Sequence, residues 1–86
     1  MDKNYIFNKK KNVILYIFKY RCEVCGYFSP QNHIHHIDKN HFNNDSFNLA
    51  VICGRCHIFL HKNCDQFVRN LSDSQVSNLE ELNRFI

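Results

Sequence analysis

The sequence predicts one small α+β domain, in which a β-hairpin and a following helix are flanked by an N-terminal and a C-terminal helix. Three observations support this fold class. The chain has 86 residues, which is the length of a single domain. Its middle contains two short apolar stretches separated by polar turn residues, whereas the apolar spacing at both ends is helical. Two Cys-x-x-Cys pairs enclose the middle, and a bound metal ion can hold such a small core together.

The N-terminal third is predicted to be an arm, a helix and a metal knuckle. Residues 1–11 are polar and basic, and we expect a loose arm there. Residues 12–20 carry apolar side chains at positions 13, 14, 17 and 18, which favours a short helix, although their β-branched and aromatic content also allows a strand. Cys22–Gly26 is expected to form a knuckle, because the glycine after the second cysteine permits a tight turn.

The middle of the chain is predicted to be a hairpin followed by a helix. We expect strands at His33–Ile37 and Asn48–Ile52. Between them, Asn43-Asn44-Asp45 can adopt the left-handed turn conformations that a hairpin requires. A helix is expected from Gly54 to about Asn63.

The C-terminal end is predicted to be an amphipathic helix. Ser72 and Gln75 have the spacing of a capping box, and apolar residues follow at helical intervals over 73–86. We expect this helix to pack on the core or on a partner. The chain is therefore divided into an arm (1–11), a metal-stapled domain (12–64) and a C-terminal helical segment (65–86).

Four cysteines are predicted to bind one structural zinc ion. Two close pairs of thiolates suit a closed tetrahedral site, and they are Cys22, Cys25, Cys53 and Cys56. Unrelated buried thiols or a redox dithiol are the alternative, which two pairs in so short a chain disfavour. The apolar run 13–18 is too short for a signal peptide or a membrane span, so we expect a cytoplasmic protein with no membrane association. Cys64 is expected to remain a free thiol.

A second, open metal site is predicted from the histidines. His57 and His61 lie four residues apart on the expected helix, so their imidazoles share one face. The third ligand is expected from His35 or His36, but neighbours in a strand point to opposite faces and spacing alone leaves the choice open. Each histidine taken singly could equally be a solvated polar side chain. The remaining two, His33 and His41, are expected to be surface residues.

This pattern resembles the HNH endonucleases, the ββα-metal nuclease family, and especially the small members with a four-cysteine zinc site found in phages and mobile elements. The resemblance is carried by three short runs within residues 20–62: His35-His36-Ile37-Asp38, Asn48-Leu49, and Cys53-x-x-Cys56-His57-x-x-x-His61. It implies a hairpin and a helix that hold one catalytic divalent cation, which could be Mg²⁺, Mn²⁺, Ni²⁺ or Zn²⁺. Asn43-Asn44 departs from the family, because many members have glycines there.

The resemblance also implies a role for each residue of the site. His35, His57 and His61 would be ligands of the catalytic cation, and His36 would be the general base. Asn48 would tie down the hairpin loop and hold the base in position. The implied reaction is metal-dependent hydrolysis of DNA phosphodiester bonds, by nicking or double-strand cutting, to a 5′-phosphate and a 3′-hydroxyl.

The charge distribution is compatible with a nucleic-acid partner but does not establish one. Residues 1–64 carry nine Lys and Arg against four acidic residues, whereas 65–86 carry two against four. Arg55 and Lys62 flank the expected site helix and are candidates for contacts with DNA phosphates. Two alternatives are a non-catalytic zinc-ribbon module that binds nucleic acid and a protein-interaction domain. No separate recognition domain is visible in the sequence, so we expect sequence specificity to be low, to derive from a homodimer or to be supplied by a partner protein.

Overall fold

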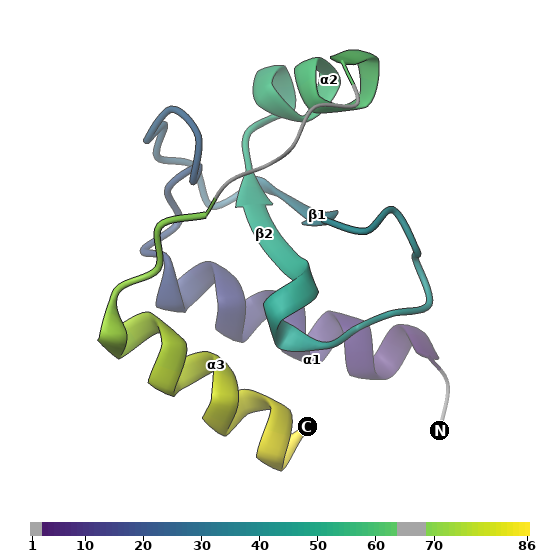
Figure 1. The fold of residues 1–86 in the computed structure, drawn as a ribbon, viewed down its shortest axis with the longest axis vertical. Coiled ribbons are helices and arrows are strands. Elements are labelled where there is room, and N and C mark those ends of the chain that lie inside the picture. The colour runs from purple at the N-terminus through teal and green to yellow at the C-terminus, as the bar shows by residue number, and fades with distance from the viewer. Residues whose placement is uncertain (1–2, 64–68) are drawn as a thin grey trace.

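The computed structural model describes residues 3–63 and 69–86, which form a small α+β domain around one antiparallel hairpin (Figure 1). In chain order its elements are α1 (Lys3–Ile17), β1 (His33–His36), the short 3₁₀ helix η1 (Ser46–Asn48), β2 (Leu49–Ile52), α2 (Gly54–Asn63) and α3 (Asp73–Phe85). Within the described part of the chain, no helix combines the length and the apolar character that crossing a bilayer requires.

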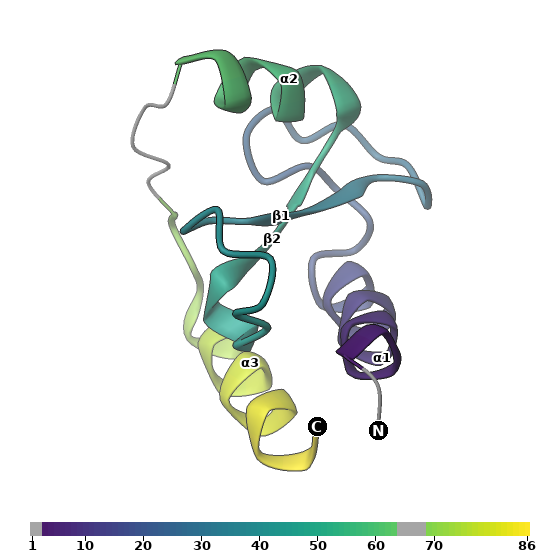
Figure 2. The ribbon, with the colours of Figure 1, turned by 90° about the vertical axis from the view of Figure 1, so that its right-hand side faces the viewer.

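The hairpin is covered on both faces, because α1 and α3 lie on one side of it and α2 lies on the other (Figures 1 and 2). Successive residues of a strand point to opposite faces, so β2 contributes to two cores. The core toward α1 and α3 consists of Ile14, Leu15, Phe18, Ile34, Leu49, Val51, Leu79 and Leu82. The smaller core toward α2 consists of Cys22, Ala50, Ile52, Cys53 and Leu60. Burial on both faces explains the uninterrupted apolar run of β2.

The register of the hairpin separates the two central histidines. His35 is paired with Ala50, and His36 is paired with Leu49. Ala50 belongs to the core toward α2, whereas Leu49 belongs to the core toward α1 and α3. His35 therefore faces α2 and His36 faces α1, a choice that sequence spacing left open.

The loose arm expected over 1–11 is not found, because residues 3–11 belong to α1. One of the lysines that made this segment resemble a solvated tail, Lys10, lies on the buried face of the helix. Lys10 is only 6% exposed. Its ammonium donates hydrogen bonds to the Asn44 carbonyl oxygen at 2.7 Å and to Asn83 Oδ1 at 3.0 Å, and these acceptors replace water.

The end of α1 turns the chain back toward the hairpin. The helix ends at Ile17, three residues before the expected Tyr20, and the strand alternative for this stretch is excluded. Lys19 and Tyr20 have positive φ angles of 57° and 59°, and the Tyr20 N–H donates to the Leu15 carbonyl at 2.8 Å. The tight turn expected at Gly26 is confirmed by its φ of 80°, a value that suits glycine.

The loop between the strands is built from side-chain turns. Within this loop positive φ occurs only at Lys39 (63°), so the expectation of left-handed conformations at Asn43-Asn44-Asp45 is wrong. Instead, four side-chain oxygens each accept a hydrogen bond from the backbone N–H two residues further on: those of Asp38, Asn40, Asn43 and Asp45. Because Asn and Asp can form these turns without a left-handed backbone, the loop needs no glycine.

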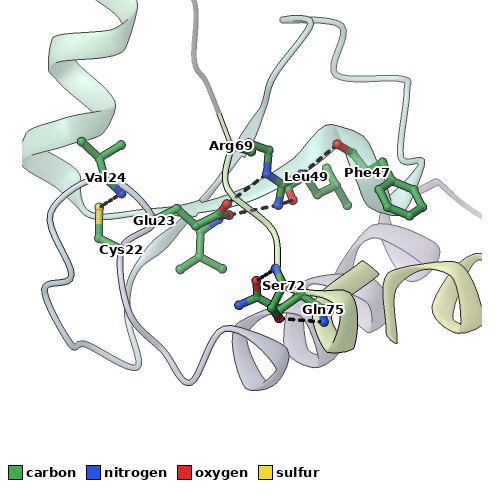
Figure 3. A network of polar contacts seen from close by, with 9 residues as sticks. Cys22, Glu23, Val24, Phe47, Leu49, Arg69, Ser72 and Gln75 are labelled. Atoms are coloured by element: carbon green, nitrogen blue, oxygen red, sulfur yellow. Dashed lines mark hydrogen bonds and ion pairs between the residues drawn. The ribbon is translucent and has the colours of Figure 1, made fainter. Parts of the chain in front are cut away.

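The C-terminal helix packs on the domain. The capping box is confirmed, because Ser72 Oγ accepts from the Gln75 N–H and Gln75 Oε1 accepts from the Ser72 N–H (Figure 3). Leu79 and Leu82 are buried in the core that α3 shares with α1. The predicted free thiol Cys64 lies outside the described residues.

A buried ion pair ties the segment before α3 to the hairpin (Figure 3). Arg69 Nε and Nη2 donate to the two carboxylate oxygens of Glu23 at 2.9 and 3.1 Å. The same guanidinium donates to the carbonyls of Phe47 and Leu49 at 2.9 and 3.3 Å. Glu23 also accepts from the Val51 N–H at 2.8 Å. This network joins the first Cys-x-x-Cys turn to β2 and thereby fixes the position of one of the two cysteine-bearing segments.

Candidate metal centres

The four predicted zinc ligands lie together at the junction of the first knuckle, β2 and α2. Cys22 and Cys25 come from the turn after α1, Cys53 follows β2, and Cys56 lies in the first turn of α2. Their Sγ atoms all lie within 4.8 Å of one another. The Sγ atoms of Cys25 and Cys53 are 3.6 Å apart. A tetrahedral zinc with Zn–S bonds of about 2.3 Å requires S–S separations of about 3.8 Å, so this cluster fits one ion.

The electrostatics of the cluster favour a bound cation. The pKa of Cys22 is lowered to about 7: burial opposes ionisation, but hydrogen bonds from the backbone N–H groups of Cys25, Cys53 and Val24 outweigh it. The pKa of Cys56 is raised, because burial and the neighbouring Cys53 and Cys25 thiols disfavour a further negative charge. A divalent cation removes this like-charge penalty, since thiolates are its ligands. The donor set therefore fits a structural metal such as zinc.

The second candidate centre is a cluster of three imidazoles between β1 and α2. His35 reaches it from β1, and His57 and His61 reach it from successive turns of α2. One ring nitrogen of each lies within 4.8 Å of the others. The Nε2 atoms of His57 and His61 are 3.0 Å apart, and the His35 ring stands nearly perpendicular to both, at centroid distances of 5.2 and 5.6 Å. The i, i+4 spacing on the helix and the register of the strand together produce this convergence.

Burial and the neighbouring histidines favour the neutral form of two of these imidazoles, which is the form that binds metals. The pKa of His35 is lowered to about 4 by burial and by the neighbouring His57 and His61. The pKa of His57 is also lowered, by burial first and then by His61. A neutral imidazole has a free lone pair for a metal, so His35 is ready to coordinate at neutral pH without losing a proton. Three nitrogen donors suit Zn²⁺, Ni²⁺ and similar cations.

A cleft of about 350 Å³ connects the imidazole cluster with the other side of the hairpin. It is lined by Phe7, Ile34, His35, His36, Lys39, His41, His57 and His61. The ligand cluster and the predicted base thus border the same space, although they lie on opposite faces of β1. That space is large enough to admit water and part of a phosphate group.

His36 is held firmly on the α1 side of the cleft. It is 8% exposed, and its ring stacks on Phe7 of α1 at a centroid distance of 5.4 Å and an interplanar angle of 19°. Its Nε2 lies 3.0 Å from Asn44 Oδ1. These contacts restrict the ring in both position and orientation.

Asn48 closes the base of the loop that follows β1. Its Oδ1 accepts from the Asp38 N–H at 3.0 Å, and its Nδ2 donates to Asp38 Oδ1 at 2.9 Å and to the Asn43 carbonyl at 2.8 Å. The Asn48 carbonyl accepts from the Ile37 N–H at 2.9 Å. Because Ile37 follows His36 directly, these four bonds define where β1 ends.

The two residues predicted to contact DNA and the two histidines predicted to be surface residues lie on or next to the elements that form this site. Arg55 and Lys62 are exposed on α2. His33 and His41 are exposed as expected, but the His33 ring lies 5.3 Å from that of His57, and His41 lies 5.0 Å from His36. The histidine rings therefore form two contact groups, one of His33, His35, His57 and His61 and the other of His36 and His41. The signal for His33 was present in the sequence, because i and i+2 residues share a strand face.

The residues missed by sequence reasoning are Asn44, Lys10 and Phe7. Asn44 was considered only as a turn residue, and Lys10 and Phe7 were assigned to a loose arm. Phe7 and Lys10 lie three residues apart, which is helical spacing. That spacing was the available signal, but the surrounding lysines concealed it.

Comparison of the chain with protein-family models, with curated proteins and with solved structures yields no match. The functional interpretation therefore depends on the site itself.

Proposed function

We propose that this protein is a metal-dependent DNA endonuclease of the HNH type with a ββα-metal core. The proposal rests chiefly on one observation: the imidazoles of His35, His57 and His61 converge beside a buried His36 in a single cleft. The proposed reaction requires a histidine that binds the metal and a histidine that acts as the base. The proposal is supported by the strand register, which directs His35 and His36 to opposite faces of β1.

The reaction proposed is hydrolysis of a phosphodiester bond to a 5′-phosphate and a 3′-hydroxyl. When bound by His35, His57 and His61, a divalent cation supplies Lewis acidity at a phosphate oxygen and stabilises the charge of the leaving 3′ oxygen. His36 takes the proton from the attacking water, a step for which a positioned base typically contributes about 10²–10⁴-fold. Asn48 acts indirectly, because its bonds to Asp38 and Asn43 hold the loop that borders the base.

DNA would approach the exposed side of α2. Arg55 and Lys62 are exposed on a face of α2 other than the one that carries His57 and His61, so their charges would hold DNA phosphates at some distance from the scissile bond. Such contacts set affinity and register but carry no sequence information, so we expect specificity to come from a second copy or a partner protein. The four-cysteine zinc site would be purely structural, because its closed donor set leaves no position for substrate.

Plasmid cleavage by purified protein tests the proposal. The wild type, His36→Ala and His33→Ala are compared with Mg²⁺, Mn²⁺, Ni²⁺, Zn²⁺ or EDTA, and the zinc content of each is measured. His33→Ala is the matched control, because it removes an exposed imidazole of the same strand that lies beside the His57 ring but does not belong to the ligand cluster. We expect metal-dependent nicking or linearisation that His36→Ala loses and His33→Ala keeps.

A folded, zinc-loaded wild type that cuts DNA with none of these metals would refute the nuclease proposal. DNA binding by that inactive protein would instead identify a non-catalytic zinc-ribbon module. Light scattering of the same samples with and without DNA tests for a homodimer.

A further inference from the structure

The orientation of His36 depends on a residue outside the expected catalytic set. His36 is the last residue of β1, and its ring lies between Phe7 and the loop after the strand. The loop residue that reaches the ring is Asn44, whose Oδ1 lies 3.0 Å from His36 Nε2. Because Oδ1 of an amide can only accept a hydrogen bond, Nε2 must be the donor in this contact.

That donor assignment determines the chemistry of the other ring nitrogen. A neutral imidazole carries one N–H and one lone pair, and which nitrogen has which is set by its hydrogen-bond partner. With the proton on Nε2, the lone pair of His36 is on Nδ1. Nδ1 is then the atom that can accept a proton from water.

Asn44 is itself held from several sides. The Lys10 ammonium donates to the Asn44 carbonyl at 2.7 Å and to Asn83 Oδ1 at 3.0 Å. Asn83 Oδ1 also accepts from the Ser46 N–H at 2.8 Å, two residues after Asn44. Immediately before Asn44, the Asn43 carbonyl accepts from Asn48 at 2.8 Å. The backbone on both sides of Asn44 is thus anchored to α1, α3 and η1, which presents its amide to His36 in a fixed direction.

We propose that Asn44 is a positioning residue that fixes His36 in its Nε2-protonated tautomer and so leaves Nδ1 as the proton acceptor of the reaction. The role of Nδ1 as proton acceptor rests on the proposed nuclease function, whereas the assignment of the His36 tautomer does not. Because the buried Lys10 holds the backbone carbonyl of Asn44, the Asn44 side-chain amide can act as the rigid supporting group that a preorganised site requires.

The tautomer can be read directly by NMR, independently of activity. A long-range ¹H–¹⁵N correlation spectrum of ¹⁵N-labelled, zinc-loaded protein at neutral pH distinguishes the protonated from the unprotonated nitrogen of each imidazole. The His36 signals are assigned by their disappearance in His36→Gln. We expect wild-type His36 to be protonated at Nε2 alone, and Asn44→Ala to show a mixture of both tautomers.

Asn43→Ala is the matched control for loosening of the loop. The Asn43 side chain donates to Asp38 and accepts from the Asp45 N–H, and among the residues that the structure describes it makes no hydrogen bond to His36. We expect Asn43→Ala to retain the single Nε2-protonated tautomer. Mixing of tautomers in Asn43→Ala to the same extent as in Asn44→Ala would overturn the specific role of Asn44.

Two other results would also overturn the proposal. One is wild-type His36 protonated at Nδ1, a result that does not depend on whether Asn44→Ala folds. The other is an Asn44→Ala spectrum with the wild-type tautomer. In cleavage assays, Asn44→Ala should lower kcat by about 10–100-fold with KM near the wild-type value, the range expected when a functional histidine loses its supporting hydrogen bond. A wild type with Nε2-protonated His36 that cuts no DNA would refute the nuclease function while leaving the assignment of Asn44 intact.

Discussion

Replacing Arg69 by alanine should destabilise the fold far more than replacing a surface arginine. The side chains of Arg69 and Glu23 are only 10% and 8% exposed, and the guanidinium makes four hydrogen bonds, two to Glu23 and two to carbonyls before and within β2. Removing one partner of a buried ion pair costs about 3–5 kcal/mol, because the other charge remains buried without compensation. A domain of this size has a free energy of unfolding of roughly 4–13 kcal/mol, so most of its stability is at risk.

The pKa of Glu23 indicates how that cost depends on pH. Burial raises the pKa of Glu23 above its ordinary value even though Arg69 and the Val51 N–H oppose the shift. A raised folded-state pKa means that the folded state binds more protons than the unfolded state, so stability falls as pH rises from the unfolded value toward the folded one. Without Arg69 this shift should increase. The cost of Arg69→Ala should therefore be larger at pH 7 than near pH 4.

Urea unfolding followed by circular dichroism, at a fixed free Zn²⁺ concentration, measures these differences. Arg69→Ala should lower the free energy of unfolding by about 3 kcal/mol or more at pH 7, or the Tm by about 12–24 °C. Arg84→Ala, an exposed arginine in the last turn of α3, is the matched control and should stay within about 0.5 kcal/mol of wild type. Glu23→Gln added to Arg69→Ala should recover part of the loss, because it removes the unpaired charge. A cost below 1 kcal/mol for Arg69→Ala, or no recovery in the double variant, would refute this reasoning.

Three further predictions concern the metals and α1. Chelation of the structural metal by EDTA, or the substitution Cys25→Ser, should abolish cooperative unfolding as measured by calorimetry. An unchanged unfolding transition would contradict the proposal that a metal bound by the four cysteines stabilises the fold. Lowering the pH from about 6.5 to about 4 should destabilise the wild type, because the lowered pKa of His35 means that the unfolded state binds a proton which the folded state does not. His35→Gln should make the free energy of unfolding less dependent on pH over this range. Equal pH dependence of the two proteins in urea titrations would contradict this prediction. Lys10→Ala should cost about 1–3 kcal/mol, because it removes the charged donor of the half-buried Asn44 carbonyl and one of the two donors of Asn83 Oδ1. Lys9→Ala, at an exposed position of the same helix, should cost less than about 0.5 kcal/mol. Similar losses for both variants in thermal melts would show that burial of Lys10 does not matter.

Local patterns were sufficient to predict most of the elements. The helix Gly54–Asn63 is found with the expected bounds, and the capping box at Ser72 starts α3 as expected. The two strands differ from their predicted ranges by one residue each, because Ile37 belongs to the loop and Asn48 to η1. These features depend on neighbours within about four residues, so the sequence contains the information directly.

The errors arose where a polar residue is stabilised by distant parts of the chain. The first eleven residues looked like a solvated arm because nothing local indicates that Lys10 has acceptors in the loop and in α3. The asparagines after β1 were assigned a left-handed backbone, whereas they use side-chain turns. In both cases the partner lies on another segment, and a periodicity analysis contains no information about it.

The sequence by itself determined the members of the cysteine cluster and two of the three members of the imidazole cluster. The paired spacing of the cysteines and the i, i+4 spacing of His57 and His61 follow from local geometry, because a turn or a helix face brings such residues together. Only the tertiary structure decided that His35 joins the α2 imidazoles while His36 turns toward Asn44 and α1. The physical reason is that a one-residue shift of strand register exchanges the two faces, and register is set by packing both sides of β2 against different helices.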